Sequence, residues 1–447
     1  MKLDKLLIAA VLLAGLSGLV WWSNKREKAN EGKPPADASP KILTLNEESI
    51  RQIEIKHRDS EPTVLKRDDA NRWSITAPKP LAADQAAVAS ITSGVSNLSS
   101  ERVVDYKVTD LAAYGLAPAA VELTFTTKDG KTSKLLVGDD TPTANAVYAN
   151  LGGDPRLFTM ASYSKTNFDK TSKDLRDKRL MTFDQDKISR VELTAKKGAI
   201  EFGRIAQNEW QILKPKPLRA DGFQVEELVR KLKDANMDTS VPDDDAKKAA
   251  AAFGSAPVVG VAKVTDASGT QTLEVHKSKD DYYAKSSVVE GVYKVTKDLG
   301  DGLDKSADDF RNKKLFDFGF SDPNRIEFKD GPQSVVGSKS ADKWTSAAGK
   351  ELDSTSVQAF IDKIRDLSAS KFPESGFGTT AIELTVVSND GKRTEKVQIA
   401  PASTANFLAR REGEPALYEL EATAVQDLRK AANDVKEAPP PAPAKKK

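Results

Sequence analysis

Short segments in which apolar and polar residues alternate recur along the chain, and a tryptophan follows each of them. The alternating segments cover residues 52–56, 190–194 and 325–329, and the tryptophans are Trp73, Trp210 and Trp344, spaced by roughly 135 residues. Alternation with a period of two predicts a strand that buries one face. The constant spacing indicates that a domain-sized unit occurs three times.

An aspartate and a helical pattern of apolar residues follow each tryptophan. Asp84, Asp221 and Asp353 stand immediately before these patterns, where an N-cap is expected. Spacings of three and four place the apolar residues on one helix face. These residues are Val88, Ile91, Val95 and Leu98, then Val225, Leu228, Val229 and Leu232, then Val357, Ile361, Ile364 and Leu367. The pattern predicts one packed helix in each copy.

A Pro-x-Pro sequence joins strand and helix in the first two copies only. It covers residues 78–80 and 215–217, and prolines cannot join a ladder through their nitrogen, so it predicts a stiff corner. The third copy lacks it and has Ser346 where the others have Ile75 and Ile212. Any role of this corner is therefore not expected in the third copy.

Hairpin signals complete each copy. The dipeptides Asp129-Gly130, Ser268-Gly269 and Asp390-Gly391 lie between alternating segments and favour tight turns. The first two copies close with related basic segments, 175–180 and 310–315, which we interpret as helices, and the third closes with a predicted helix at 423–433. The fold class expected is α+β, with three tandem similar units of antiparallel strands and packed helices at 42–182, 183–320 and, in divergent form, 321–435.

Composition and the ends of the chain refine this organisation. The 447 residues include 39% hydrophobic and 30% charged residues, with 68 basic and 66 acidic side chains and a net charge of +2. This balance suits small soluble domains and gives no basic stripe for nucleic acid. Residues 6–22 carry no charge and end in Trp21 and Trp22, which predicts a transmembrane anchor behind a short cytoplasmic start at 1–5. Residues 23–41 are expected to form a flexible tether, and residues 436–447 a disordered tail rich in proline and lysine.

The location of the folded units follows from the anchor and from cysteine usage. The chain contains no cysteine, which favours an oxidising compartment outside the cytoplasm. We therefore expect a single-pass membrane protein with most of the chain outside the cytoplasm. Charge flanking the anchor does not fix its orientation, because Lys2 and Lys5 precede it and Lys25, Arg26 and Lys28 follow it.

The recurring tryptophan segment with Pro-x-Pro-Leu-x-Ala-Asp and the amphipathic helix, behind one anchor, resembles the bacterial family called domain of unknown function 4340. The resemblance covers about residues 42–435 in tandem copies. Members of that family resemble auxiliary parts of ABC-type transport systems, including systems linked to gliding motility. The resemblance implies an extracytoplasmic accessory protein, held as a single-pass protein in the bacterial inner membrane with most of the chain in the periplasm, and says nothing of chemistry.

Candidate chemistry is sparse. His57 and His276 are the only histidines and stand at non-equivalent positions of the repeat, so we interpret both as exposed strand residues rather than as catalytic residues or metal ligands. The tryptophans are expected to be core residues, with stacking on sugars or partners as the alternative. The basic residues Arg176, Lys178, Arg179, Arg311, Lys313 and Lys314 are candidates for binding an anionic partner, although cations also favour a helix C-terminus.

The function expected from these observations is non-catalytic. We expect no catalytic, cofactor or metal residues, and an auxiliary role in an ABC-type transport system in which the units bind protein partners such as a permease. The alternatives are a cell-envelope scaffold or glycan-binding protein and, less favoured, an envelope hydrolase, since carboxylate pairs for glycoside hydrolysis cannot be recognised without their geometry.

Overall fold

The structure is a computed structural model that describes residues 39–142, 145–206, 209–239, 246–318, 323–402 and 405–439. The chain divides into two compact units, with the division between Lys178 and Arg179. The segment 1–38, with the proposed anchor and most of the tether, lies outside the described residues, as does the tail from 440. Among the helices that the described residues form, none has both the length and the apolar character of a membrane span.

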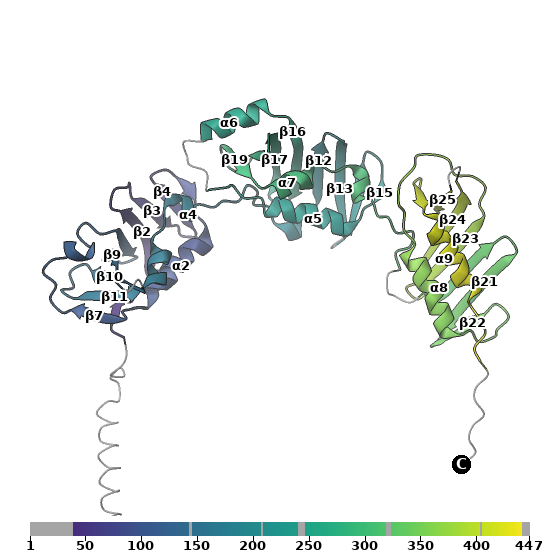
Figure 1. Ribbon diagram of the computed structural model, residues 1–447, viewed down its shortest axis with the longest axis horizontal. Helices are drawn as coiled ribbons and strands as arrows, with labels where there is room; N and C mark the ends of the chain where they lie inside the picture. Colours follow the sequence, from purple (N-terminus) through teal and green to yellow (C-terminus); the bar gives the residue numbers. More distant parts are fainter. Residues whose placement is uncertain are drawn as a thin grey trace, which may run out of the picture. The chain divides into compact units, whose positions relative to one another are not determined.

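The first unit contains a nine-stranded antiparallel sheet with the order β5-β4-β3-β2-β8-β9-β10-β11-β7, and a small β1-β6 pair (Figure 1). Its strands are β1 Lys41–Leu43, β2 Ile50–His57, β3 Thr63–Arg67, β4 Trp73–Ala77, β5 Leu81–Ala82, β6 Leu98–Ser99, β7 Arg102–Asp105, β8 Val121–Thr127, β9 Thr132–Asp140, β10 Ala146–Leu151 and β11 Leu157–Ala161. Its helices are α2 Gln85–Ser96, α3 Ser162–Phe168 and α4 Ser172–Leu175, with short 3₁₀ turns at Glu47–Ser49 and Ala112–Tyr114.

The second unit contains two further antiparallel sheets, ordered β15-β14-β13-β12-β16-β17-β18-β19 and β22-β21-β20-β23-β24-β25-β26. The first sheet is formed by β12 Arg190–Ala195, β13 Gly198–Ala206, β14 Glu209–Lys214, β15 Leu218–Arg219, β16 Val258–Asp266, β17 Gly269–Ser278, β18 Asp281–Ser286 and β19 Val292–Val295. Its helices are α5 Gly222–Lys233, α6 Ala246–Ser255 and α7 Lys297–Leu303, with 3₁₀ turns at Gln185–Lys187 and Ala307–Phe310.

The last sheet is formed by β20 Arg325–Asp330, β21 Gln333–Ser340, β22 Lys343–Ser346, β23 Ile382–Ser388, β24 Arg393–Pro401, β25 Phe407–Arg411 and β26 Leu417–Leu420. Helices α8 Ser354–Asp366 and α9 Ala422–Asn433 lie together on one of its faces (Figure 1). The strand that opens each copy, β2, β12 or β20, lies between the tryptophan hairpin and the later hairpin in all three sheets. The three sheets therefore have the same central topology, and the α+β class expected from the sequence is confirmed.

The tryptophans and helix caps take the positions expected. Trp73, Trp210 and Trp344 are 7%, 4% and 5% exposed and belong to the hydrophobic cores. The carboxylates of Asp84 and Asp221 each accept two backbone N–H groups at the start of the following helix, and that of Asp353 accepts the N–H of Ser356. These contacts satisfy amides that lack a partner within the helix. The core interpretation of the tryptophans and the N-cap prediction are both confirmed.

Two details of the helix prediction needed correction. The first helix ends at Ser96, so Leu98 lies in β6, and Leu367 is the C-cap of α8. Both leucines are still buried, at 5% and 2% exposure. The extended strand or cap geometry can continue the apolar face beyond the last helical turn, which is why the spacing alone extended the helices too far.

The missing Pro-x-Pro of the third copy has a visible consequence. In the first two sheets, β4 and β14 pair with the short strands β5 and β15 that follow the corner. In the described part of the third sheet, β22 is the edge strand. One isolated bridge, between Thr345 and Glu351, is found where the other sheets have the short strand. The loss of the corner thus coincides with the loss of one strand.

Candidate functional site

The six candidate basic residues lie in extended segments. Helix α4 ends at Leu175 and the 3₁₀ turn before Arg311 ends at Phe310, so the prediction of basic helices was wrong. The backbone N–H of Asp84 donates to the carbonyl oxygen of Leu175 at 2.8 Å. In the same way, the N–H of Asp221 donates to that of Phe310 at 2.7 Å. Because these carbonyls bond across to another segment, the chain leaves the helix there. We call residues 175–180 and 310–315 the closing straps.

The side chains of the closing straps differ in exposure. Arg179, Lys313 and Lys314 are exposed, and Arg176 and Lys178 are half-buried. Arg311 is only 7% exposed; its Nη1 lies 3.1 Å from an Asp308 oxygen, and its guanidinium lies 3.6 Å from the ring centroid of Phe372. Arg311 therefore packs within the second unit. The partner-binding role of the strap residues stays a prediction, and Arg311 is the weakest member of that set.

The two histidines are held in contacts with acids. His57 Nε2 lies 2.8 Å from Asp169 Oδ1, and the imidazole is 21% exposed. His276 is buried, with Nδ1 2.9 Å from the carbonyl oxygen of Ala256 and Nε2 2.7 Å from a Glu274 oxygen. The interpretation of His276 as exposed was wrong, because Phe253 of α6 stacks on its ring at 3.8 Å. Helix α6, which covers His276, has no counterpart in the sequence pattern of the first copy.

Each sheet carries the same kind of polar row on the face opposite the buried apolar side chains of its strands. In the second sheet, α6 lies over part of this face, because its Phe253 stacks on His276. A glutamate of the opening strand pairs in register with a residue of the neighbouring strand in the sheet. That residue pairs in turn with a residue of the following strand in the sheet. The rows are Glu54-Thr124-Lys134, Glu192-Lys263-Thr272 and Glu327-Thr385-Lys396. Neighbours on one face of an antiparallel sheet interact through their side chains. These polar faces are the surfaces that the repeat leaves open.

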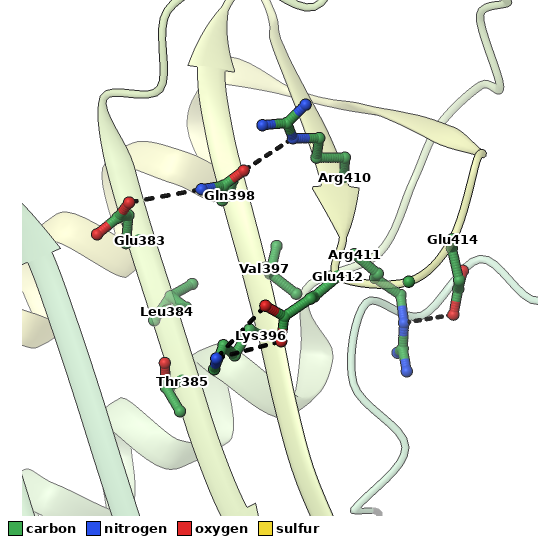
Figure 2. Close-up of a pocket in the computed structure, with 11 residues that line it drawn as sticks. Glu383, Leu384, Thr385, Lys396, Val397, Gln398, Arg410, Arg411, Glu412 and Glu414 are labelled. Atoms are coloured by element: carbon green, nitrogen blue, oxygen red, sulfur yellow. Dashed lines mark hydrogen bonds and ion pairs between the residues drawn. The ribbon is translucent and has the colours of Figure 1, made fainter.

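The third sheet forms a groove of about 590 Å³ on this face. A ladder of side chains crosses it: Arg410 Nε donates to Gln398 Oε1 at 2.8 Å, and Gln398 Nε2 donates to Glu383 Oε1 at 3.5 Å (Figure 2). Beside it, Lys396 Nζ lies 3.2 Å from a Glu412 oxygen. The groove thus offers donors and acceptors of both charges that are linked by hydrogen bonds and ion pairs, and we take it as the candidate functional site.

An aromatic ring supports one end of the ladder. The guanidinium of Arg410 lies 4.5 Å from the ring centroid of Phe377, a cation–π geometry that restricts the arginine. Restricting a long side chain before binding reduces the entropy lost when a partner binds. The end of the groove at Arg410 is therefore partly preorganised.

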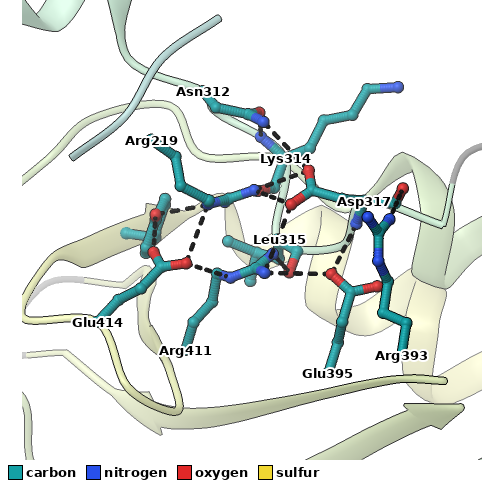
Figure 3. Close-up of polar contacts among 10 residues, drawn as sticks. Arg219, Asn312, Lys314, Leu315, Asp317, Arg393, Glu395, Arg411 and Glu414 are labelled. Carbon is teal, nitrogen blue, oxygen red and sulfur yellow. Dashed lines mark hydrogen bonds and ion pairs between the residues drawn. The ribbon is translucent and has the colours of Figure 1, made fainter. Parts of the chain in front are cut away.

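A second polar cluster borders the groove within the second unit (Figure 3). Arg219 of β15 places Nη1 2.6 Å from Asp317 Oδ2 and Nε 3.0 Å from Glu414 Oε1. Arg411 shares that Glu414 oxygen at 2.8 Å and lies 3.1 Å from Glu395. Burial lowers the pKa of Arg219, but the Asp317 carboxylate, Tyr418 and Glu414 outweigh it, so its pKa is raised above the ordinary value. We call these five charged residues the ionic clamp.

The clamp was not anticipated, although the sequence held one signal. The aligned corners read Pro80-Leu81-Ala82 in the first copy and Pro217-Leu218-Arg219 in the second, so an arginine replaces an alanine at an otherwise matching position. Its partners lie 98 and 195 residues further along the chain, at Asp317 and Glu414. Repeat spacing alone does not reveal such pairings.

Glu201 of the second sheet gives a pH prediction. A hydrogen bond from Lys214, 2.7 Å away, holds the pKa of Glu201 below its ordinary value of 4.5, against the opposing effect of burial. A depressed folded-state pKa stabilises the fold above the unfolded value, and this stability is lost as the pH falls through the folded value. We expect Glu201→Gln to make the unfolding free energy fall less steeply between about pH 5 and about pH 3.

Urea unfolding of wild type and variant across that range measures the difference. Lys214→Met, which removes the partner and keeps the carboxyl, should flatten the same profile. Identical slopes for wild type and both variants would show that Lys214 does not perturb Glu201.

In the part of the chain that the structure describes, no group of three or more histidine or carboxylate side chains is arranged to hold a metal ion.

No curated protein and no solved structure matches the chain significantly. One family model matches it twice, over residues 73–209 and 210–385, so that both matches begin at a repeat tryptophan. The chain therefore belongs to the family described as Domain of unknown function (DUF4340), of which it carries two matched copies.

Proposed function

We propose that the protein is a non-catalytic, membrane-anchored accessory protein of an ABC-type transport system, located outside the cytoplasm, that binds a protein partner through the groove of its third sheet. The observation that carries this proposal is the groove, where Glu383, Gln398 and Arg410 form a connected ladder on an open sheet face. Protein interfaces outside the apolar centre use such hydrogen-bonding groups to set register and specificity.

The use of the other distinctive side chains supports a binding role. The repeat tryptophans fill cores, and His57 and His276 contact Asp169 and Glu274. The residues that sequence singles out most strongly thus serve the fold, and the polar rows are the feature that all three sheets present outward. For location, the uncharged segment 6–22 supports an anchor in the inner membrane.

Glycan binding is the second candidate. The observation that favours it is the combination, in one groove, of an amide, a carboxylate and an arginine stacked on Phe377. Such groups also suit the hydroxyls of a polar ligand. Binding of the purified folded units to isolated envelope glycan, lost with the groove variant below, would favour this candidate over a protein partner.

The test is affinity capture of the full anchored chain in mild detergent, with the partner identified by mass spectrometry. The groove variant carries Glu383→Ala, Gln398→Ala and Arg410→Ala. A matched control carries Lys263→Ala, Thr272→Ala and Lys285→Ala, which lie on consecutive strands of the second sheet. Partly exposed polar substitutions of this kind change stability by about 0.5 kcal/mol or less each.

We expect the groove variant to recover the partner at least about tenfold less well, because several positioned contacts are removed at once and each tenfold corresponds to about 1.4 kcal/mol. The control variant should recover it as wild type does. Equal recovery by all three proteins would show that the groove is not the binding site. Turnover of an envelope substrate by the folded units, abolished by one acidic substitution that leaves folding intact, would contradict the non-catalytic proposal.

A further inference from the structure

The end of β25 and the turn that follows it take part in both the groove and the ionic clamp. Arg410 and Glu412 make the groove contacts with Gln398 and Lys396. Arg411 and Glu414 pair with each other at 2.8 Å, on the other side of the turn from the ladder (Figure 2). Consecutive residues of one short segment therefore hold the groove on one side and the clamp on the other.

Arg219 is the member of the clamp that comes from the second copy of the repeat. Its guanidinium contacts Asp317, Glu414, the hydroxyl of Tyr418 at 3.3 Å and the carbonyl oxygen of Lys314. The side chains of Arg219 and Arg411 are only 19% and 12% exposed. Ion pairs this shielded from water depend on all of their partners, because removing one leaves a poorly solvated charge behind.

The corresponding positions one copy earlier can be recognised by matching bonds. The N–H of Leu180 donates to Ala235 as that of Leu315 donates to Leu367. The amide of residue 182 donates to residue 271 at 2.8 Å as that of residue 317 donates to residue 395 at 2.9 Å. Residue 286 donates to the carbonyl oxygen of residue 180 as residue 411 donates to that of residue 315.

The residues at these matched positions differ in charge. The earlier set is Thr182, Gln271 and Ser286, and the later set is Asp317, Glu395 and Arg411. Ala82 likewise matches Arg219, since each carbonyl accepts the N–H of a closing strap. The matched bonds thus form at uncharged residues in the earlier positions, so these bonds do not depend on the charges of the clamp.

We infer that Arg219 of the second copy is a positioning residue for the groove of the third copy: through Glu414 and Arg411 it fixes the end of β25, which carries Arg410, and the turn after it, which carries Glu412. This inference rests on the proposed function, because it assumes that the groove binds the partner. The clamp joins the second and third copies, which lie in one compact unit.

The first experiment measures the clamp without any partner. Because the chain has no cysteine, spin labels can be attached to Thr194→Cys in the second copy and to Pro415→Cys in the turn after β25, both exposed positions. Double electron–electron resonance on the full chain should give one narrow distance distribution. Arg219→Ala should broaden it, and Arg219→Lys, which keeps the charge and loses the planar fork, should fall between the two. Arg230→Ala, at an exposed α5 position, should leave it narrow.

The second experiment repeats the affinity capture with the same variants. We expect Arg219→Ala to lower partner recovery about tenfold, which is within the usual range of coupling between sites. Arg219→Lys should recover an intermediate amount of partner. Arg230→Ala should recover as much as wild type. Circular dichroism and melting curves establish that each variant is folded. An unchanged distance distribution, or a broadened one with full recovery, would overturn the inference. Full recovery by the groove variant would instead overturn the proposed function, and the distances would still decide whether the clamp exists.

Discussion

Trp210→Ala should lower the free energy of unfolding of the second unit by about 3–5 kcal/mol. The indole is 4% exposed, and its Nε1 donates to Glu226 Oε1 at 2.7 Å. Arg204 lies over the ring at 5.1 Å and pairs with the same glutamate at 3.0 Å. The substitution therefore leaves a cavity and also removes one donor from a half-buried carboxylate.

Denaturant unfolding followed by circular dichroism measures this loss. Trp210→Phe should recover a large part of it, because a ring is retained while the hydrogen bond is lost. Phe223→Ala is the matched aromatic control, since Phe223 is 75% exposed on the neighbouring helix and should change stability by about 0.5 kcal/mol or less. A loss for Trp210→Ala no larger than that of Phe223→Ala would contradict a core role for the repeat tryptophan.

Removal of residues 1–25 should reduce the partner-dependent function strongly when the folded units are directed to the same compartment. An anchor confines the units near a membrane partner, and such confinement commonly raises apparent affinity about 10²–10⁴-fold. A tether of roughly 18 residues reaches up to about 60 Å when extended. The described core begins only at Ile42, so the truncation should leave the folded units intact.

A second version, with the same units fused to an unrelated transmembrane helix, is the control and should restore function. The function of the soluble version and of the re-anchored version is measured by complementation of a deletion strain at matched protein levels. Full function of the soluble units at native abundance would show that the membrane attachment is not needed.

Repeat, caps and hairpins could be predicted because their signals are local. The spacing of Val225, Leu228 and Leu232, with Asp221 before it, is set within one helix, and Asp390-Gly391 is set within one turn. In these cases the side-chain period and the cap chemistry favour the same element that the tertiary structure uses. The apolar residues identified in this way belong to the core.

The errors and omissions came from contacts that are distant in sequence. The strap at Arg311 has a helical pattern, yet Ala220 pairs with it as a bridge. His276 became buried because of α6, whose position no period reveals. The groove ladder depends on the register of three strands, which places Glu383, Gln398 and Arg410 side by side. Such pairings follow from the assembled sheet and have no local signature.

The most direct test of the proposed function is photo-crosslinking in living cells from two positions of the third copy. Thr385 lines the groove without belonging to its ladder, and Gln358 is exposed on α8, which lies on the opposite face of the same sheet. A photoreactive phenylalanine analogue replaces each in turn in the full anchored chain. We expect a discrete adduct with a membrane-complex protein from position 385 and none from position 358. Adducts from position 358 alone, or no protein adduct from position 385, would contradict the groove as the binding surface.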